Sequence, residues 1–308
     1  IYTQEGVPMQ TTSNVVIGAI QPYAGEFGIS TNPESFAVYG YRKYFTDANQ
    51  GSVLRLSQDG ITEISNYGMY DFFRDQLGVL SSGKAVGGYD IHNKCYTLSL
   101  QPASESVPTQ TLSFDESIKG WSSRYSYKPS NMFSVQNNFY STVTSAEKQE
   151  IHASTGVQIG DIFQHYSNNV NRANFYTTQY VSQIKSIFNA NPSVIKTFQT
   201  INYEGAPNWS MTSFVTNEDQ ANSVAVFNMP LTLADMETSL LKNEFKQKED
   251  KYFADLVNTS AFTQGEVVFG QSISGVKGFF ATVLLEATNT ATSGTNELFA
   301  ISTNYKES

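Results

Sequence analysis

The sequence predicts a mainly β protein, with β-propeller-like blades of antiparallel strands, few short helices and an appended β element. Three observations predict this class. Aromatic residues make up 13% of the 308 residues, and aromatic side chains fit the half-buried faces of sheets. Short strand-like runs recur from Phe36 onward, with turn residues between them. Asp47 and Asp90 lie in similar strand–turn–strand contexts, and their spacing falls within the ~40–50-residue period of a propeller blade.

The N-terminal segment, residues 1–35, is the first of three segments that we expect, and it is rich in turn residues. Within it, Val15–Ile17 has the composition of a strand. The numbered sequence begins with Ile1 rather than Met. We therefore expect it to be a piece of a longer or processed polypeptide.

The stretch from Lys43 to Ser65 contains the clearest strand and turn signals in the chain. One strand runs into Asp47 and a polar loop, and the next strand ends just before Asp59-Gly60. An Asp-Gly pair readily adopts the positive φ angles of a tight hairpin. The predicted elements are strands over Phe36–Tyr41, Lys43–Thr46, Val53–Leu56 and Ile61–Ile64, then a helix over Met69–Leu77 whose aromatic and Leu positions face the sheet.

The same order of strand, aspartate, polar turn and strand recurs around Asp90, between Ala85–Tyr89 and Lys94–Leu100. Asp161 gives a weaker third example. Aspartate often accepts hydrogen bonds from the backbone of its own turn, so these residues are expected to fasten turns. A purely local turn role and a blade repeat are compatible. The predicted propeller-like region covers residues 36–216.

An acidic, polar stretch over residues 217–222 marks the start of the third segment, residues 217–308. This segment is expected to be an appended β/α element, or to complete the same domain. Its predicted helix is Leu231–Phe245. The remaining predicted strands of the chain are Thr111–Phe114, Gly120–Tyr127, Met132–Phe139, Val157–Tyr166, Ser182–Phe188, Ile195–Tyr203, Glu266–Gly270, Gly278–Glu286 and Glu297–Ser302.

The chain is acidic, with a net charge of −9 at pH 7 and a pI near 4.9. This charge argues against nonspecific wrapping of nucleic acid, which needs clustered Lys and Arg to displace counterions from phosphates. An acidic surface is compatible with a channel through which DNA slides without sticking. The sequence has no signal peptide, no lipidation motif and no apolar run of ~18 residues, so we expect a soluble protein without a membrane span.

The sequence identifies no residue for catalysis, cofactor binding or metal binding. His92, His152 and His165 do not form a metal-ligand pattern, and no nucleotide-binding or hydrolase motif occurs. Calcium is an open candidate at the Asp47–Asn49 turn because it prefers oxygen ligands, although the spacing is not that of an EF-hand. The single cysteine, Cys95, lies in an apolar run and is expected to be buried and inert.

Carbohydrate chemistry is a second open candidate. Asp115, Glu116 and Glu204 could supply the paired carboxylates of a glycosidase, although a chain with 28 acidic residues offers many such pairs. Trp121 and Trp209 could bind a sugar if exposed. In an aromatic-rich β protein, packing of these indoles in the core is the stronger expectation.

Six stretches are distinctive in combination: residues 42–65 (RKYFTDANQGSVLRLSQDGITEIS), 68–77 (GMYDFFRDQL), 87–100 (GGYDIHNKCYTLSL), 112–129 (LSFDESIKGWSSRYSYKP), 195–205 (IKTFQTINYEG) and 297–305 (ELFAISTNY). Together they resemble the large tail structural proteins of bacteriophages, the muzzle or nozzle proteins of crAss-like and marine phages. The resemblance implies a virion component that in some members is built around a β-propeller and forms a ring about the tail axis. It implies no catalytic residues. Such proteins are usually far longer than this chain.

We therefore expect a non-enzymatic structural protein of the phage virion tail. It would form a homo-oligomeric ring around the DNA exit channel and contribute to tail assembly and to genome retention or ejection. Its expected partners are other tail and portal-proximal virion proteins, and phage DNA that passes without sequence-specific binding. The alternative is a carbohydrate-binding or carbohydrate-cleaving β-propeller of a tailspike or secreted protein. An extracellular adhesin is a third, weaker option.

Overall fold

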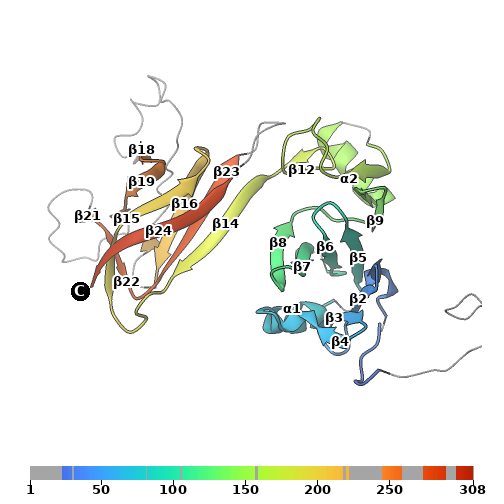
Figure 1. The fold of residues 1–308 in the computed structure, drawn as a ribbon. Coiled ribbons are helices and arrows are strands. Elements are labelled where there is room, and N and C mark those ends of the chain that lie inside the picture. The colour runs from blue at the N-terminus through green and yellow to red at the C-terminus, as the bar shows by residue number, and fades with distance from the viewer. Residues whose placement is uncertain are drawn as a thin grey trace, which may run out of the picture. The chain divides into compact units, whose positions relative to one another are not determined.

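The computed structural model of the chain describes residues 23–29, 31–80, 82–104, 106–156, 159–217, 220–221, 245–258, 273–288 and 296–307. These residues are mainly β, with two α-helices. Contacts divide the chain into two compact units, Ile1–Tyr166 (unit 1) and Ser167–Ser308 (unit 2). Both are drawn in Figure 1. The segment boundary expected at 216/217 lies inside unit 2, and the three-segment division itself stays a prediction.

The first sheet of unit 1 is a four-stranded antiparallel meander that confirms the strands predicted around Asp47. Neighbouring strands pair in chain order, beginning at Ala37 with Tyr44 and ending at Ser57 with Gly60. Gly60 closes the last hairpin with a φ of +101°, a conformation that favours glycine. The elements are η1 (Pro33–Ser35), β1 (Ala37–Tyr39), β2 (Arg42–Asp47), β3 (Ser52–Ser57), β4 (Gly60–Glu63) and η2 (Ile64–Asn66).

The helix predicted after this sheet is present as α1 (Tyr70–Gly78). Phe73 and Leu77 lie one helical turn apart and are buried, whereas Tyr70 is half-exposed. The ring centroid of Phe73 lies 4.5 Å from that of Trp121. The prediction that the aromatic and Leu positions face the sheets is confirmed for Phe73 and Leu77.

The second sheet is again a four-stranded antiparallel meander, and its second strand is buried along its whole length. One face of that strand is apolar, with Tyr96, Leu98 and Leu100 in the core. The other face carries polar side chains, of which Ser99 and Gln101 are hydrogen-bonded. Gln101 Nε2, for example, donates to the backbone oxygen of Pro129 at 2.6 Å. The strands are β5 (Lys84–Asp90), β6 (Cys95–Gln101), β7 (Gln110–Asp115) and β8 (Gly120–Tyr125).

The third sheet has three strands and corrects two predictions. The strand predicted over Met132–Phe139 is a hairpin, because Gln136 and Asn137 both adopt positive φ angles, of 50° and 71°, and reverse the chain. Within the strand predicted over Val157–Tyr166, only three residues are extended in the described part. The strands are β9 (Asn131–Val135), β10 (Asn138–Thr142) and β11 (Ile162–Gln164), in the order β11-β10-β9.

The second helix, α2 (Ser145–Thr155), was not predicted. It begins with a capping box, in which Thr144 Oγ1 accepts from the backbone of Glu147 while Glu147 binds back to the backbone of Thr144. It ends at Gly156, whose φ of 71° is the usual left-handed helix end. These caps place a surface helix between β10 and β11.

The second sheet lies between the other two sheets of unit 1, and β5 contacts both neighbours. A β-carbon on Gly87 would lie 1.9 Å from the backbone oxygen of Ser35, which ends η1. A β-carbon on Gly88 would lie 2.5 Å from the Cβ of Met132 in β9. Two adjacent glycines therefore allow β5 to approach the first sheet on one face and the third sheet on the other. Figure 1 shows the three sheets following one another in unit 1.

Successive four-stranded meanders that pack face to face are typical of propeller blades. No sheet of the described residues closes on itself, however, and no complete ring of blades is present. The mainly β class is therefore confirmed, and the propeller remains a prediction.

The described residues of unit 2 form two larger antiparallel sheets and two small two-stranded sheets, β12-β13 and β20-β21. One sheet has the order β14-β23-β16-β17. The other has the order β18-β19-β15-β22, with β24 paired along the opposite edge of β15. The strands are β12 (Asn174–Phe175), β13 (Thr178–Gln179), β14 (Val181–Phe188), β15 (Lys196–Gly205), β16 (Trp209–Thr216), β17 (Gln220–Ala221), β18 (Lys246–Lys248), β19 (Lys251–Asp255), β20 (Val257–Asn258), β21 (Ile273–Ser274), β22 (Val276–Gly278), β23 (Ala281–Thr288) and β24 (Leu298–Glu307).

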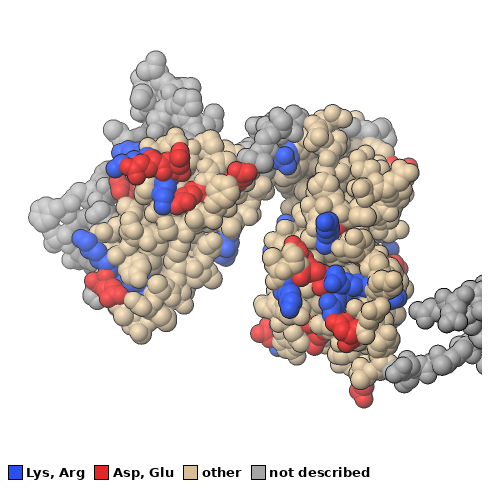
Figure 2. Space-filling model, in the orientation of Figure 1, with Lys and Arg blue, Asp and Glu red and all other residues tan. Residues whose placement is uncertain are grey.

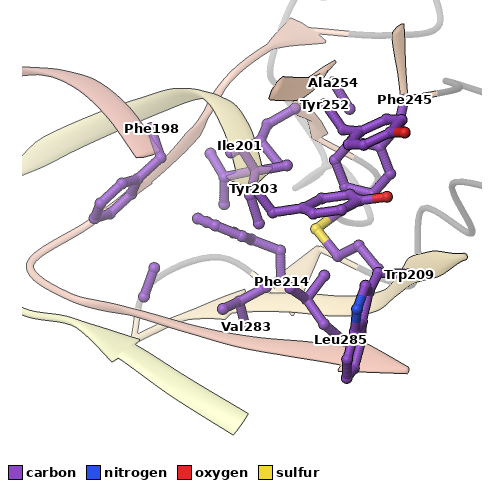
Figure 3. Close-up of a cluster of buried hydrophobic side chains, with 14 of the residues drawn as sticks. Phe198, Ile201, Tyr203, Trp209, Phe214, Phe245, Tyr252, Ala254, Val283 and Leu285 are labelled. Atoms are coloured by element: carbon purple, nitrogen blue, oxygen red, sulfur yellow. The ribbon is translucent and has the colours of Figure 1, made fainter. Parts of the chain in front are cut away.

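The core of unit 2 lies between these two sheets (Figure 3). Phe198, Ile201 and Tyr203 project from β15 toward Phe214 of β16 and Leu285 of β23. The predicted strands at residues 182–188, 195–203, 278–286 and 297–302 are present in shifted or extended form. The last two complete sheets that begin before residue 217, because β23 lies between β14 and β16 and β24 pairs with β15.

Three predicted elements lie outside the described residues: the strand at Val15–Ile17, the strand at Glu266–Gly270 and the helix at Leu231–Phe245, of which only Phe245 is described.

Candidate functional site

The turns after β2 and β5 are fastened by the aspartates that the sequence singled out. Asp47 Oδ1 accepts from the backbone N–H groups of Asn49, at 3.1 Å, and Gln50, at 3.3 Å. Asp90 Oδ1 accepts in the same way from His92, at 2.9 Å, and Asn93, at 3.2 Å. The predicted turn role is confirmed for both residues.

The repeated unit is nevertheless a strand, a turn and a strand; it is not a whole sheet. Asp47 ends the second strand of its sheet, whereas Asp90 ends the first strand of the next sheet. Asp161 does not belong to the repeat: its carboxylate is exposed and forms an ion pair with Lys148 of α2. The third example proposed from the sequence is therefore wrong.

The second oxygen of Asp90 holds the last residue of unit 1. The hydroxyl of Tyr166 donates to Asp90 Oδ2 at 2.5 Å and accepts from Asn93 Nδ2 at 2.8 Å. The ring of His92 stacks on the Tyr166 ring, with centroids 4.3 Å apart and planes inclined by 10°. Tyr166 also has a positive φ of 61°. We call this group, Asp90, His92, Asn93 and Tyr166, the Tyr166 clamp; it fixes the chain where it leaves unit 1.

His165 is the neighbouring residue and is held by a different contact. Its Nε2 lies 2.7 Å from Ser141 Oγ, and its ring lies 4.9 Å from the rings of Tyr127 and Phe139. Burial lowers the pKa of His165 to about 4, from an ordinary value of 6.5. The imidazole is therefore neutral in the folded protein at neutral pH.

Acidification from pH 6.5 to pH 4 is expected to destabilise unit 1. Across this range the unfolded chain protonates His165 but the folded chain does not, so the free energy of unfolding falls as the pH falls. The loss reaches at most ~3 kcal/mol, at ~1.4 kcal/mol per pKa unit. Urea unfolding at a series of pH values, followed by the fluorescence of Trp121, measures it. His165→Gln should flatten the dependence, and His152→Gln, at an exposed site, should not; equal slopes in both variants would contradict the assignment.

The acidic residues considered for glycoside cleavage are engaged in local contacts. Asp115 Oδ1 accepts from the backbone and hydroxyl of Ser117, both at 2.7 Å. Glu116 accepts from the Tyr44 hydroxyl at 2.9 Å and forms an ion pair with Arg55 at 3.2 Å. Asp115 and Glu116 belong to unit 1.

Glu204 belongs to unit 2, where it pairs with Lys251 at 2.5 Å. Both tryptophans make contacts within their own units rather than forming an exposed surface on which a sugar could stack. Trp121 Nε1 donates to the backbone of Ile64, and Trp209, 5% exposed, donates to the backbone of Glu297, each at 3.1 Å. The contacts of these residues explain their positions without a carbohydrate.

The calcium candidate at Asp47 has its carboxylate oxygens occupied by backbone donors, the second by Gly28 N at 2.9 Å. Among the described residues no group of three or more His, Cys, Asp and Glu is placed to hold a metal ion. Cys95 is buried as predicted, and burial, together with the nearby Asp115 and Asp90, raises the pKa of its thiol to about 11.

On the face that Figure 2 shows, Lys and Arg lie among Asp and Glu in both units rather than in one basic area. None of the described helices has both the length and the apolar composition to cross a bilayer.

Comparison with known families places unit 2 in a phage context. The sequence profile of the Crassvirus muzzle protein C-terminal domain matches residues 170–259. No curated protein matches the chain. The matched residues run from the β12 hairpin to β20, whereas β22, β23 and β24 follow them in sequence and complete both sheets. This similarity over residues 170–259 supports a crassvirus-like tail muzzle protein with a structural role in the tail of the phage virion.

Proposed function

We propose that the protein is a subunit of a homo-oligomeric ring around the DNA exit channel of the tail, where it contributes to tail assembly and to genome retention or ejection. The observation that carries this proposal is the match of residues 170–259 to the muzzle domain. The net charge of −9 supports it, because an acidic lumen repels DNA weakly and lets it pass without sequence-specific binding. Its other partners would be neighbouring tail and portal-proximal virion proteins.

We further propose that this role is mechanical rather than enzymatic. The candidate acids Asp115, Glu116 and Glu204 are bound to neighbouring residues of their own units. The alternative, a carbohydrate-cleaving or carbohydrate-binding protein, predicts shortened or retained host polysaccharide after incubation with the chain.

Electron microscopy of virions with antibody label on this protein tests the location and the ring. The expected result is label at the distal end of the tail and averaged density with rotational symmetry about the tail axis. Label elsewhere on the virion, or a single copy per tail, would contradict the ring.

A further inference from the structure

The chain leaves unit 1 through a short edge strand. β11 pairs with β10 over three residues, and in the part of the chain that the structure describes no other strand flanks it. Ile162, at the start of β11, is 60% exposed. After β11, the backbone N–H of His165 donates to the backbone oxygen of Phe139 in β10 at 2.9 Å. An edge segment of this kind opens at a low cost in free energy, so β11 alone would hold the following chain weakly.

The Tyr166 clamp ties the exit of the chain to the second sheet as well. The hydroxyl of Tyr166 is bound by Asp90 and Asn93, and Asp90 is the last residue of β5. β5 pairs with β6 along its seven residues, and Asp90 is 2% exposed. A hydrogen bond to a carboxylate that is shielded from water is among the stronger ones in a protein. The exit is therefore attached to the sheet that lies between the other two.

The backbone of Tyr166 indicates that these contacts impose the direction of the chain. Its φ of 61° lies in the left-handed region, which is rare for a residue with a bulky side chain. Such a conformation persists only where the surrounding contacts fix it, and it occurs preferentially at positions with a functional role. The side-chain contacts of Tyr166, including the stacked ring of His92, supply that fixation.

The other aspartate turn of unit 1 holds a distant segment in the same way. Asp47 Oδ1 fastens its own turn, while Asp47 Oδ2 accepts from the backbone of Gly28, 19 residues earlier in the chain. Asp90 Oδ1 fastens its own turn, while Asp90 Oδ2 accepts from Tyr166, 76 residues later. The two turns therefore attach the segments by which the chain enters and leaves the described part of unit 1.

Beyond Tyr166, the next backbone contacts of this kind lie inside unit 2. The backbone oxygen of Arg172 accepts from Gln179 Nε2 at 2.7 Å, and that of Ala173 accepts from the backbone N–H of Tyr180 at 2.9 Å. The match to the muzzle domain begins nearby, at residue 170. Tension on unit 2 thus reaches unit 1 through a short stretch of chain that enters unit 1 at Tyr166.

We propose that the Tyr166 clamp is a mechanical anchor. Tension that reaches unit 1 through the chain from unit 2 is resisted by the contacts of Tyr166 with the turn between β5 and β6, before it acts on β11. The inference goes beyond the proposed function, because it holds for a single chain whether or not copies form a ring.

Pulling on single molecules of the full 308-residue chain tests the anchor. With handles at the two chain ends, the measured quantity is the lifetime of folded unit 1 at constant force, which reports its unfolding rate. Tyr166→Phe removes the hydroxyl contacts with Asp90 and Asn93 but keeps a ring that can stack on His92. We expect unit 1 to open ~10-fold faster or more, the factor for losing one hydrogen bond to a charged group.

A second point of attachment separates an anchor from a residue that only stabilises the fold. With the C-terminal handle moved to Ser154→Cys, at an exposed site of α2, the force enters before β11 and bypasses the clamp. The native Cys95 is buried, with a thiol pKa raised to about 11, so the handle attaches at residue 154. Here Tyr166→Phe should open within ~2-fold of the parent protein. Equal acceleration at both points of attachment would overturn the proposal.

Tyr44→Phe is the matched control, because it also removes a hydroxyl that donates to a carboxylate in unit 1, that of Glu116 at 2.9 Å. Its effect should be the same at both points of attachment. A dependence as large as that of Tyr166→Phe would mean that other contacts of unit 1 behave in the same way, and would also overturn the proposal.

Asn93→Ala is a second variant of the clamp, at an exposed site. It removes the amide that donates to Tyr166 and leaves the backbone contacts of Asp90 in its own turn. Unit 1 should open ~5-fold faster than the parent protein when the chain is pulled from its two ends. Unchanged lifetimes in both Asn93→Ala and Tyr166→Phe would show that the clamp resists no tension.

Discussion

Gly87→Ala is expected to destabilise unit 1 by ~3 kcal/mol or more. The added β-carbon would lie 1.9 Å from the backbone oxygen of Ser35 and 2.9 Å from the hydroxyl of Tyr96, which itself donates to that oxygen. A backbone atom cannot rotate away as a side chain can, so β5 and η1 must separate, and overpacking of this kind typically costs ~1–3 kcal/mol even where side chains yield. Urea unfolding followed by Trp121 fluorescence measures the loss.

Gly120→Ala is the matched control, because it is also a strand glycine of the second sheet but its nearest neighbour is 3.8 Å away. Its free energy of unfolding should stay within ~0.5 kcal/mol of the parent. If Gly87→Ala were equally neutral, the close approach of β5 to η1 would be wrong, and the stacking of the first two sheets would need revision.

Phe214→Ala is expected to destabilise unit 2 by ~3–5 kcal/mol, the usual cost of removing a buried phenyl ring. Phe214 is 1% exposed and its ring lies 5.6 Å from that of Phe198 on β15, so it joins the two sheets (Figure 3). The cavity left between β15 and β16 cannot close without moving whole strands. Differential scanning calorimetry should show a lowered transition for unit 2.

Phe299→Ala removes the same ring from a site on β24 that is 73% exposed, and it should leave the transition nearly unchanged. A loss at Phe299 as large as that at Phe214 would mean that β24 is covered in solution. Equal, small losses at both positions would contradict the two-sheet core.

Much of unit 1 could be predicted from the sequence because its strands pair with their neighbours along the chain. The Asp-Gly hairpin and the two aspartate turns specify where the chain reverses. In the strands between them, apolar and polar residues alternate. The helix α2 was missed because none of its residues is buried, so it has no apolar stripe. Its signals were the capping box from Thr144 to Glu147 and Gly156, which are local and easily overlooked among turn residues.

The arrangement of unit 2 and the Tyr166 clamp could not be predicted from the sequence, for a different reason. The sequence shows that β14, β16 and β23 are strands, but not that β23 lies between the other two. Likewise Asp90 predicts a turn, while its contact with Tyr166 exists only once the third sheet has packed on the second. Contacts between distant segments depend on the whole fold rather than on any local pattern.

The position of β23 and β24 also sets the order in which the protein can fold during synthesis. The meanders of unit 1 connect strands that leave the ribosome one after another, so each sheet can form as it emerges. In unit 2, Val181 at the start of β14 pairs with Thr288, and Lys196 pairs with Glu307. The strands that are synthesised first therefore cannot complete their sheets until the last strands have been made. Until then their apolar faces stay exposed. A nascent chain stalled after residue 259 would have a folded unit 1. It would include all the residues that match the muzzle domain, but unit 2 would not be folded.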